Sequence, residues 1–235
     1  MNTEGSGAGS LLTVTGMVLQ AAPAGEYDRR VVLLTRENGR IACFARSARR
    51  QGSPLMAACS PFVFGSFRLA AARTSYVITE ASVKNYFERL RSDIVTAYYG
   101  MYFLEAAEYV TRENNDESQI LLLLYRSCQA LGSPSFSNRL VRVIFELKLV
   151  VLEGEFPGLS EAERALCSES MQYAVHYIAS SGIAELYRFQ VTEEVLCELE
   201  RFSASVCRRF FEREFQSLAI LKTMEEGADR GGTDG

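Results

Sequence analysis

Apolar and polar residues alternate with the two-residue period of β-strands over the first third of the chain. Clusters of Gly, Pro, Asn and Ser divide this part into short runs. The runs that favour strands are Leu11 to Ala21, Arg30 to Thr35, Arg40 to Arg46, Pro61 to Ala70 and Thr74 to Ala81. Five short strands within about 80 residues predict a small barrel, and the OB-fold is the commonest five-stranded arrangement.

After about Lys84 the apolar residues recur with the spacing of helices. Ser160 with Glu163 has the pattern of a capping box, and Asp116 with Gln119 resembles a capping pair. The predicted helices run from Ser92 to Arg112, from Asp116 to about Gly132, from Phe136 to Glu153, from Ser160 to about Ala179 and from Thr192 to about Met224.

The pattern as a whole predicts an α+β chain, with a small five-stranded OB-fold barrel followed by an all-α helical domain. We expect the OB-fold domain at 11–84 and the helical domain at 85–226. Residues 1–10 and 227–235 are polar, and we expect them to form a disordered leader and a disordered tail.

Charge is divided unevenly between the two predicted domains. Residues 1–84 hold 10 Lys and Arg against 5 Asp and Glu, a net charge of +5. Residues 85–235 hold 15 against 24, a net charge of −9, and the two sum to −4 for the chain. This asymmetry indicates two units with different partners.

The cellular compartment is predicted from the absence of a secretory signal and of membrane-spanning runs in the sequence. Residues 1–10 have neither the basic start nor the apolar region of a secretory signal, and the longest apolar runs are too short to span a bilayer. The six cysteines form no CxxC pair, so we interpret them as reduced thiols packed in the interior. We expect a cytoplasmic protein without a membrane partner.

The segment from Gly25 to Arg50 is basic. It holds seven arginines against three acids, a local excess of +4 in an acidic chain. Asn38-Gly39 within it is a strong hairpin signal, because a type I′ turn needs positive φ at both central residues.

Strand alternation places an aromatic residue among these arginines. In the third predicted strand Arg40, Phe44 and Arg46 share one face, opposite Ile41, Cys43 and Ala45. In the fourth, Phe62, Phe64 and Arg68 lie opposite Val63, Phe67 and Leu69. Aromatic rings stack on bases while guanidinium groups meet phosphates, so this composition is typical of a nucleic-acid surface.

The sequence therefore predicts a DNA-binding surface in which Arg46, Arg49 and Arg50 are the main phosphate contacts. Phe44 and Tyr27 are the better surface aromatics, because Phe62, Phe64 and Phe67 also suit a core. The full predicted set is Arg29, Arg30, Arg36, Arg40, Phe44, Arg46, Arg49, Arg50 and Arg68. Two alternatives stay open: an ordinary solvated surface, and a protein-interaction adapter whose basic face binds an acidic partner.

Catalysis has little support. The chain has no P-loop, GxSxG, HExxH or GxGxxG motif, and its single histidine, His176, falls in a predicted helix. An enzyme that uses His176 is a third class of function, but a lone helical histidine is usually structural or solvated. The scattered cysteines offer no zinc-binding spacing. We expect no enzyme, no cofactor and no metal.

The order of these features resembles the RecO family of bacterial recombination mediators over about residues 12 to 222. The stretch GEYDRRVVLLTRENGRIACFARSARR is similar to the N-terminal signature of the family, with Gly25, Glu26 and Asp28, then Thr35 and Gly39, then Ala45, Arg46, Ala48, Arg49 and Arg50 in the matching places. Three later stretches resemble helical-domain motifs of the family: LRSD at 90–93, FELKL at 145–149 with GEFPGL at 154–159, and FQSL at 215–218.

Two positions depart from the family pattern. Many relatives carry a four-cysteine zinc module after the GEFPGL-like segment, whereas Ser160 to Ser170 contains only Cys167. The chain thus resembles the subset without zinc. Position 47 is Ser where the family often has Gly.

The resemblance implies a recombination mediator, which binds single- and double-stranded DNA, anneals complementary strands and helps load the recombinase onto coated single strands. Its implied partners are the RecR clamp and the acidic C-terminal tail of single-strand binding protein, and its place is the cytoplasmic nucleoid. That tail ends in an apolar residue, so its site would pair a hydrophobic pocket with a basic side chain. Candidate cations in the helical domain are Arg126, Arg139, Arg142 and Lys148.

Overall fold

The computed structural model describes residues 11–73 and 75–231, with side chains described as far as residue 224. The predicted leader at 1–10 and the last four residues of the predicted tail lie outside the described residues. The chain divides into two compact units, each described by itself below. A barrel unit contains the chain to Tyr86 together with Thr111–Leu121, and a helical unit contains Phe87–Val110 and the chain from Leu122 onward.

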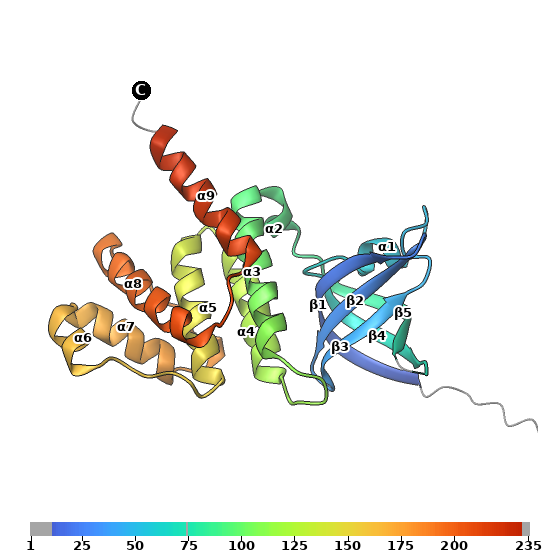
Figure 1. Cartoon of the computed structure of the whole chain (residues 1–235), viewed down its shortest axis with the longest axis horizontal. Helices are drawn as coiled ribbons and strands as arrows, with labels where there is room; N and C mark the ends of the chain where they lie inside the picture. Colours follow the sequence, from blue (N-terminus) through green and yellow to red (C-terminus); the bar gives the residue numbers. More distant parts are fainter. Residues whose placement is uncertain (1–10, 74, 232–235) are drawn as a thin grey trace, which may run out of the picture. The chain divides into compact units, whose positions relative to one another are not determined.

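Five strands close the barrel (Figure 1). Their order around it is β1-β2-β3-β5-β4, in which β3 and β5 pair in parallel and every other neighbouring pair is antiparallel. A short helix, α1 (Leu55–Ala58), lies between β3 and β4 in the chain. The strands are β1 (Leu11–Ala24), β2 (Asp28–Thr35), β3 (Gly39–Ala45), β4 (Phe64–Ala71) and β5 (Tyr76–Asn85). This is the predicted OB-fold, and closure leaves no open sheet edge.

Alternation along the strands fills the barrel, as the sequence predicted. Ile41, Cys43 and Ala45 of β3 lie in the core, while Phe44 and Arg46 face outward and are exposed. Val63, Phe67 and Leu69 also lie in the core, opposite the exposed Arg68. Phe62 departs from the outward position expected for it. It is 5% exposed with φ at 72°, and its amide donates to the Val18 carbonyl just before β4 begins.

The strands approach one another so closely at one place that only glycine fits. Gly16 of β1 pairs with Gly65 of β4. A Cβ at Gly16 would lie 2.3 Å from the Leu34 carbonyl oxygen, and a Cβ at Gly65 would lie 2.4 Å from the Ser82 carbonyl oxygen. The two opposed glycines therefore permit the tight curvature that closes the barrel.

The β2–β3 turn is covered by a segment about 75 residues further along the chain, which hydrogen-bonds to it. Residues 111–117 connect two helices of the other unit, yet they belong to the barrel unit. Arg40 donates its amide to the Arg112 carbonyl at 2.9 Å, and Asn114 donates to the Asn38 carbonyl at 3.0 Å. Gly39 has φ at 63°, and a Cβ there would lie 2.2 Å from the Arg112 oxygen. The turn glycine is thus required twice, for its dihedral angle and for this contact.

The helical unit packs amphipathic helices around an aromatic core. Phe103 of α3 stacks on Phe145 of α5 with ring centroids 4.1 Å apart, and Tyr102 meets Phe215 edge-on at 5.5 Å. The helices are α2 (Glu88–Ser92), α3 (Ile94–Val110), α4 (Ser118–Leu131), α5 (Asn138–Leu152), α6 (Glu161–Leu166), α7 (Glu169–Ser180), α8 (Glu193–Phe210) and α9 (Gln216–Gly231), with a 3₁₀ turn at Ile183–Glu185.

Two predicted helices are broken in the structure, and the one predicted from Ser92 begins two residues later, at Ile94. Asp93 has extended dihedrals and accepts from the Thr96 amide at 2.7 Å, so α3 begins after it. Ser168 caps α7 by accepting from the Met171 amide, which separates α7 from α6. The predicted capping box of Ser160 with Glu163 is confirmed at the start of α6.

The second break separates α8 from α9, where the sequence predicted one helix from Thr192 to about Met224. Phe211 is extended at the end of α8, and both Phe211 and Phe215 are buried. Burying both rings against Tyr109 favours the break over a continuous helix. Helix α9 continues to Gly231 and therefore enters the segment expected to be a disordered tail from residue 227.

The six cysteines are free thiols but not all are interior. Cys43, Cys59 and Cys128 are buried, whereas Cys197 is exposed on α8. Burial raises the pKa of Cys43 to about 12 and that of Cys59 to about 11. In the part of the chain that the structure describes, no helix is long and apolar enough to cross a membrane.

Candidate nucleic-acid interface

The outward face of the β2–β3 hairpin carries an arginine beside an aromatic ring at its open end. Arg30 of β2 and Phe44 of β3 are direct cross-strand partners, and both side chains are exposed. Arg46 follows two residues after Phe44 and is also exposed. Side chains on one face of paired strands lie close enough to act together, so these three form one patch.

The loop after β3 displays three arginines from a fixed backbone. Ala48 is fully buried in the barrel core, which anchors the loop between Arg46 and Arg49. The Ser47 amide donates to the Asp28 carboxylate at 2.7 Å, and the Arg49 amide donates to the Tyr27 carbonyl at 2.8 Å. Arg46, Arg49 and Arg50 are therefore exposed on an ordered loop, and the Arg49 Nη1 also donates to the carbonyls of Gly25 at 3.3 Å and Glu26 at 3.2 Å.

Ser47 itself adopts the left-handed conformation, with φ at 54°. A residue other than glycine is disfavoured there by about 1–2 kcal/mol. The hydrogen bond to Asp28 offsets part of that cost, and it explains how this loop tolerates serine at a position that suits glycine.

A second arginine–aromatic pair lies at the same end of the hairpin. The Arg50 guanidinium carbon lies 4.5 Å from the centroid of the Tyr27 ring, within the range of a cation–π contact. Tyr27 is 39% exposed, and its hydrogen bond with Glu26 raises the pKa of the phenol. We call Tyr27, Arg30, Phe44, Arg46, Arg49 and Arg50 the open-end patch.

Charge in the open-end patch is not cancelled by nearby acids. Among the described residues, none of its four arginines forms an ion pair with a carboxylate. Of the acids in the same segment, Asp28 accepts from the Ser47 amide and Glu37 accepts from the Thr15 amide at 2.8 Å. The third acid, Glu26, is exposed and forms a hydrogen bond with the Tyr27 phenol instead of an ion pair with these arginines. The arginines of the patch are therefore available to an external anion.

Four predicted DNA contacts fall outside this patch. Arg29 turns toward α1, where its Nη1 donates to the carbonyls of Met56 at 2.8 Å and Cys59 at 3.1 Å. Arg40 donates from Nε to the Thr111 carbonyl at 3.1 Å. Arg68 pairs with Glu80 at 2.9 Å on the outside of the barrel. Arg36 is exposed at the turn end of the hairpin.

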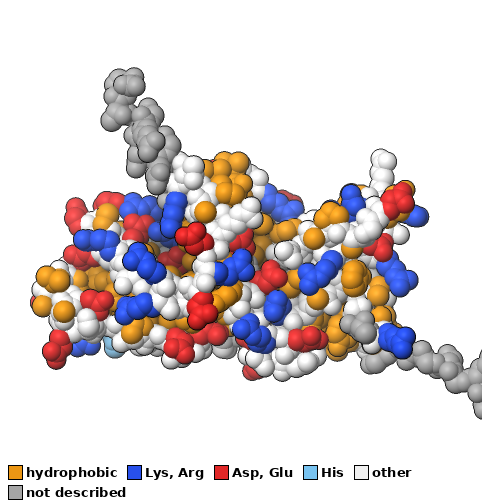
Figure 2. Space-filling model, in the orientation of Figure 1, with side chains coloured by type: hydrophobic (Ala, Val, Ile, Leu, Met, Phe, Trp, Pro, Cys, Tyr) orange, Lys and Arg blue, Asp and Glu red, His pale blue; other side chains and the backbone are white. Residues whose placement is uncertain are grey.

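The length of the hairpin explains the separation. Six residue steps divide the Arg29–Ala45 pair from the Thr35–Gly39 pair, which is about 20 Å at roughly 3.3 Å per residue. The basic segment that is continuous in sequence therefore forms two sites at opposite ends of one hairpin. On the face of the barrel that Figure 2 shows, Lys and Arg side chains are dispersed rather than gathered in one block.

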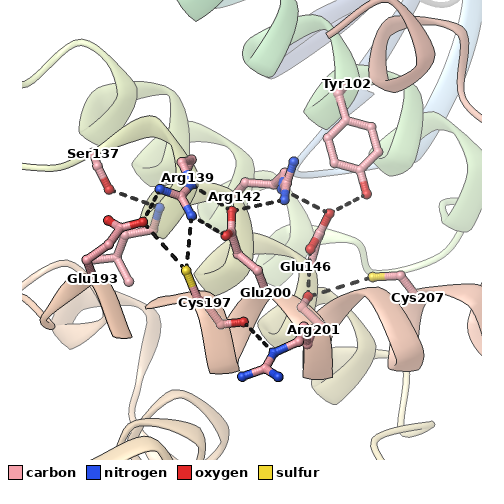
Figure 3. Close-up of polar contacts among 12 residues, drawn as sticks. Tyr102, Ser137, Arg139, Arg142, Glu146, Glu193, Cys197, Glu200, Arg201 and Cys207 are labelled. Carbon is pink, nitrogen blue, oxygen red and sulfur yellow. Dashed lines mark hydrogen bonds and ion pairs between the residues drawn. The ribbon is translucent and has the colours of Figure 1, made fainter. Parts of the chain in front are cut away.

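Two cations of the helical unit, Arg139 and Arg142, are held by carboxylates (Figure 3). Arg139 of α5 pairs with Glu193 and Glu200 of α8, each at 2.5 Å, and hydrogen bonding to Glu200 raises its pKa further. Arg142 also contacts Glu200, at 3.3 Å. Glu146 accepts from the Tyr102 hydroxyl at 2.9 Å and from the Ser203 hydroxyl at 2.6 Å, with the Arg142 Nε 3.7 Å away.

The other two predicted partner-binding cations differ from each other. Lys148 is buried and donates from Nζ to the carbonyls of Ala179 at 3.1 Å and Ser181 at 2.7 Å. It thus satisfies the end of α7, and burial lowers its pKa. Arg126 is exposed on α4 and donates to Gln129 one turn away. Only Arg126 of the four lies on the surface without a carboxylate among the described residues.

Comparison with known proteins agrees with this architecture. Residues 10–87 match the family described as "Recombination protein O N terminal", and residues 91–167 match "Recombination protein O C terminal". A DNA repair protein RecO from Alkaliphilus metalliredigens is 32% identical over 172 residues, which cover 73% of this chain and 69% of the relative. The chain belongs to the RecO family. Another DNA repair protein RecO, from Acetivibrio thermocellus, is 24% identical over 244 residues, 91% of this chain and 97% of the relative.

Membership of the RecO family gives the chain its broad role, because these relatives are DNA repair and recombination proteins. The N-terminal match includes every strand of the barrel and the whole open-end patch. The C-terminal match ends at Cys167. Among the described residues, no group of three or more His, Cys, Asp and Glu side chains is arranged to hold a metal ion.

One groove of this RecO family member was missed by sequence reasoning. A cavity of about 470 Å³ in the helical unit is lined by Phe211, Phe215 and Leu218. Its charged walls carry four cations and four carboxylates: Arg142, Arg208, Arg213 and Lys222, and Glu146, Glu200, Glu212 and Glu214. It forms where α8 ends and α9 begins. The run RRFFEREFQSL at 208–218 carries this mixture of rings and cations, but predicting one continuous helix hid the groove.

His176 has no acid beside it in the groove that it lines. It is exposed on α7, and the described residues around that groove include Arg164, Gln172 and Tyr173 but no carboxylate. A histidine acts as a general acid or base most effectively when a second group orients it. This geometry gives His176 no partner for such chemistry among the described residues.

Proposed function

We propose that the protein is a recombination mediator that binds single- and double-stranded DNA through the open-end patch. In this role it anneals complementary strands and helps load the recombinase onto strands coated with single-strand binding protein. The observation that carries the proposal is the loop that presents Arg46, Arg49 and Arg50 on a backbone anchored by Ala48 and Asp28. Membership of the RecO family supports the same reading.

Annealing needs no covalent chemistry. Two complementary strands repel each other through their phosphates, and a surface that neutralises phosphates on both lowers the cost of their encounter. Arginine suits this task because its planar fork meets phosphate oxygens with two hydrogen bonds. The four arginines of the open-end patch are the contacts that we assign to the phosphate backbone. The substrate places the protein on the nucleoid.

Protein partners are the second part of the proposal. We assign the acidic, apolar-ended tail of single-strand binding protein to the groove between α8 and α9, and the RecR clamp remains a partner without an assigned surface. The groove pairs the rings of Phe211 and Phe215 with cations such as Lys222. This combination suits a peptide with acidic residues before an apolar end. Arg139 and Lys148 are less suited, because carboxylates and backbone carbonyls already hold them.

A strand-annealing assay tests the proposal. Two complementary oligonucleotides with donor and acceptor dyes are mixed at low salt, and duplex formation is followed by energy transfer. The wild-type protein is expected to accelerate annealing, whereas the triple variant Arg46→Ala, Arg49→Ala, Arg50→Ala is expected to lose most of that acceleration. A matched control removes three exposed arginines of the helical unit, Arg164→Ala, Arg201→Ala and Arg209→Ala, and is expected to anneal like wild type.

The adapter alternative makes a different prediction for the same proteins. If the basic face serves an acidic protein, the wild type binds a glutamate-rich peptide but neither anneals nor retains oligonucleotides at low salt. That outcome would overturn the DNA-binding proposal.

A further inference from the structure

The open-end patch carries two exposed aromatic rings as well as its arginines. Tyr27 is 39% exposed and Phe44 is 37% exposed, while the barrel core is filled by other side chains. A single exposed ring on a surface needs no special explanation. Here, however, each ring has an arginine partner within the same patch.

The two rings are placed in matching surroundings. Arg50 lies over the Tyr27 ring, and Arg30 is the direct cross-strand partner of Phe44. Arg49 is bonded through its amide to the Tyr27 carbonyl, and Arg46 follows Phe44 by two residues. Each ring therefore has an arginine of the patch beside it, Arg50 beside Tyr27 and Arg30 beside Phe44.

We propose that Tyr27 and Phe44 stack on unpaired bases, so that the open-end patch prefers single-stranded over double-stranded DNA. The inference rests on the proposed function and names the form of DNA that this surface reads. The arginines bind the phosphates of single-stranded and double-stranded DNA alike. The rings add affinity only for a strand whose bases are unpaired.

The physical reason is the accessibility of the base faces. In a duplex each base is stacked and paired, so a side chain at the surface reaches only its edges. In a single strand every base offers a π-face, and stacking on a protein ring is tolerant of sequence.

The position of the rings also matches a known property of OB-folds. Ligands of this fold contact the outer face of the second and third strands and the loop that joins the first two strands. Phe44 lies on β3, and Tyr27 lies in the loop between β1 and β2. Both rings thus fall on the surface that the fold leaves available for an oligonucleotide.

The test separates bases from phosphates. Binding of the full-length chain is measured by fluorescence anisotropy against three labelled probes of equal length: oligothymidylate, an abasic strand that keeps the phosphates but lacks the bases, and a duplex. The wild type is expected to bind oligothymidylate about 100-fold more tightly than the abasic strand, which corresponds to about tenfold for each ring.

Four variants assign the preference to the rings. Tyr27→Ala and Phe44→Ala are each expected to weaken binding to oligothymidylate about tenfold and to leave binding to the abasic strand and duplex within twofold. Tyr27→Phe keeps the ring and is expected to bind like wild type. Tyr173→Ala, which removes a ring 70% exposed in the helical unit, serves as the control and is expected to change nothing.

The outcomes separate the stacking inference from the proposed function, which is DNA binding by the open-end patch. Equal binding of oligothymidylate and abasic strand by the wild type would overturn the stacking inference while leaving DNA binding intact. Equal loss on both probes in the alanine variants would do the same, because it would indicate a loosened loop rather than lost stacking. Failure to bind any of the three probes would overturn the proposed function as well.

Discussion

Arginine has opposite roles in the two units of this protein. In the open-end patch of the barrel, four arginines are exposed, and among the described residues no carboxylate forms an ion pair with them. In the helical unit, Arg139 and Arg142 share Glu200 and reach further glutamates on both sides. The comparison teaches that the number of arginines does not identify an anion-binding site. What identifies it is where the neighbouring acids are directed.

The difference follows from the local structure of each unit. On α5, Arg142 and Glu146 are four residues apart, so the helix itself brings them together, and Glu200 arrives from α8. On the hairpin, Asp28 and Glu37 accept from backbone amides instead. The same two residue types thus build an internal network in one unit and leave a charged surface on the other.

The largest effect is expected from breaking the network of the helical unit. Glu146→Ala removes the acceptor of Tyr102 and Ser203 and one of the two carboxylates that pair with Arg142. Removing one member of a buried charged network typically costs about 3–5 kcal/mol. We expect an early unfolding transition of the helical unit in urea, measured by circular dichroism.

The control for this change is Glu161→Ala, an exposed glutamate of α6, which is expected to leave the transition unchanged. DNA affinity of the folded Glu146→Ala protein at low urea should match that of wild type. A loss of stability below about 1 kcal/mol would contradict the structural role that we give to this network.

An intermediate effect on stability is expected from replacing Arg29, which tests whether an arginine of the barrel supports the fold or contacts DNA. Its Nη1 donates to Met56 and Cys59 at the end of α1, so we interpret it as a structural residue. Arg29→Met should lower barrel stability by about 1–3 kcal/mol, because it leaves partly buried carbonyls without their donor. The salt dependence of DNA binding should keep the wild-type slope. If Arg29→Met flattened the salt dependence as much as Arg46→Ala does, Arg29 would contact DNA phosphates after all.

The smallest effect concerns Asp93 and is dependent on pH. Hydrogen bonding to Thr96 lowers the pKa of the Asp93 carboxyl in the folded protein. A depressed folded pKa means that the carboxylate stabilises the fold above the unfolded pKa of about 3.9 and loses this contribution as pH falls through the folded value. Asp93→Ala should therefore cost about 1 kcal/mol at pH 7, as capping residues do, and much less at pH 2–3.

Thermal unfolding of wild type and Asp93→Ala at both pH values checks this prediction. Asp93→Asn serves as the comparison, because asparagine retains the capping acceptor without the charge. If the difference between wild type and Asp93→Ala were the same at pH 7 and pH 2–3, the pKa shift would not contribute to stability.

Local patterns in the sequence predicted the barrel well. The alternation of Ile41, Cys43 and Ala45 with Phe44 and Arg46 gave both faces of β3, because the side chains of a strand alternate regardless of what surrounds it. Asn38-Gly39 marked the position of the turn for an equally local reason, but not its type. Gly39 has φ at 63° whereas Asn38 does not have a positive φ, and the Thr35–Gly39 pair leaves a three-residue loop instead of a type I′ turn. The family resemblance rests on the same stretch together with motifs of the helical domain, and the matched families confirm it.

Long-range contacts account for what the sequence did not reveal. Arg29 and Arg30 are adjacent arginines, yet one reaches α1 and the other faces solvent, which depends on a helix about thirty residues away. The docking of residues 111–117 on the β2–β3 turn likewise has no local signal. The break between Phe211 and Phe215 depends on rings contributed by α3. Each of these outcomes is decided by packing rather than by propensity.

The central claim is that the open-end patch meets phosphates while the exposed arginines of the helical unit do not. The direct test is the slope of log affinity against log salt for a single-stranded oligonucleotide, measured by anisotropy. Four arginine contacts predict a wild-type slope of roughly −3, and removing Arg46, Arg49 and Arg50 together should flatten it by about 2. The control triple Arg164→Ala, Arg201→Ala, Arg209→Ala should keep the wild-type slope. A wild-type slope near zero, or equal flattening in both triple variants, would contradict the account.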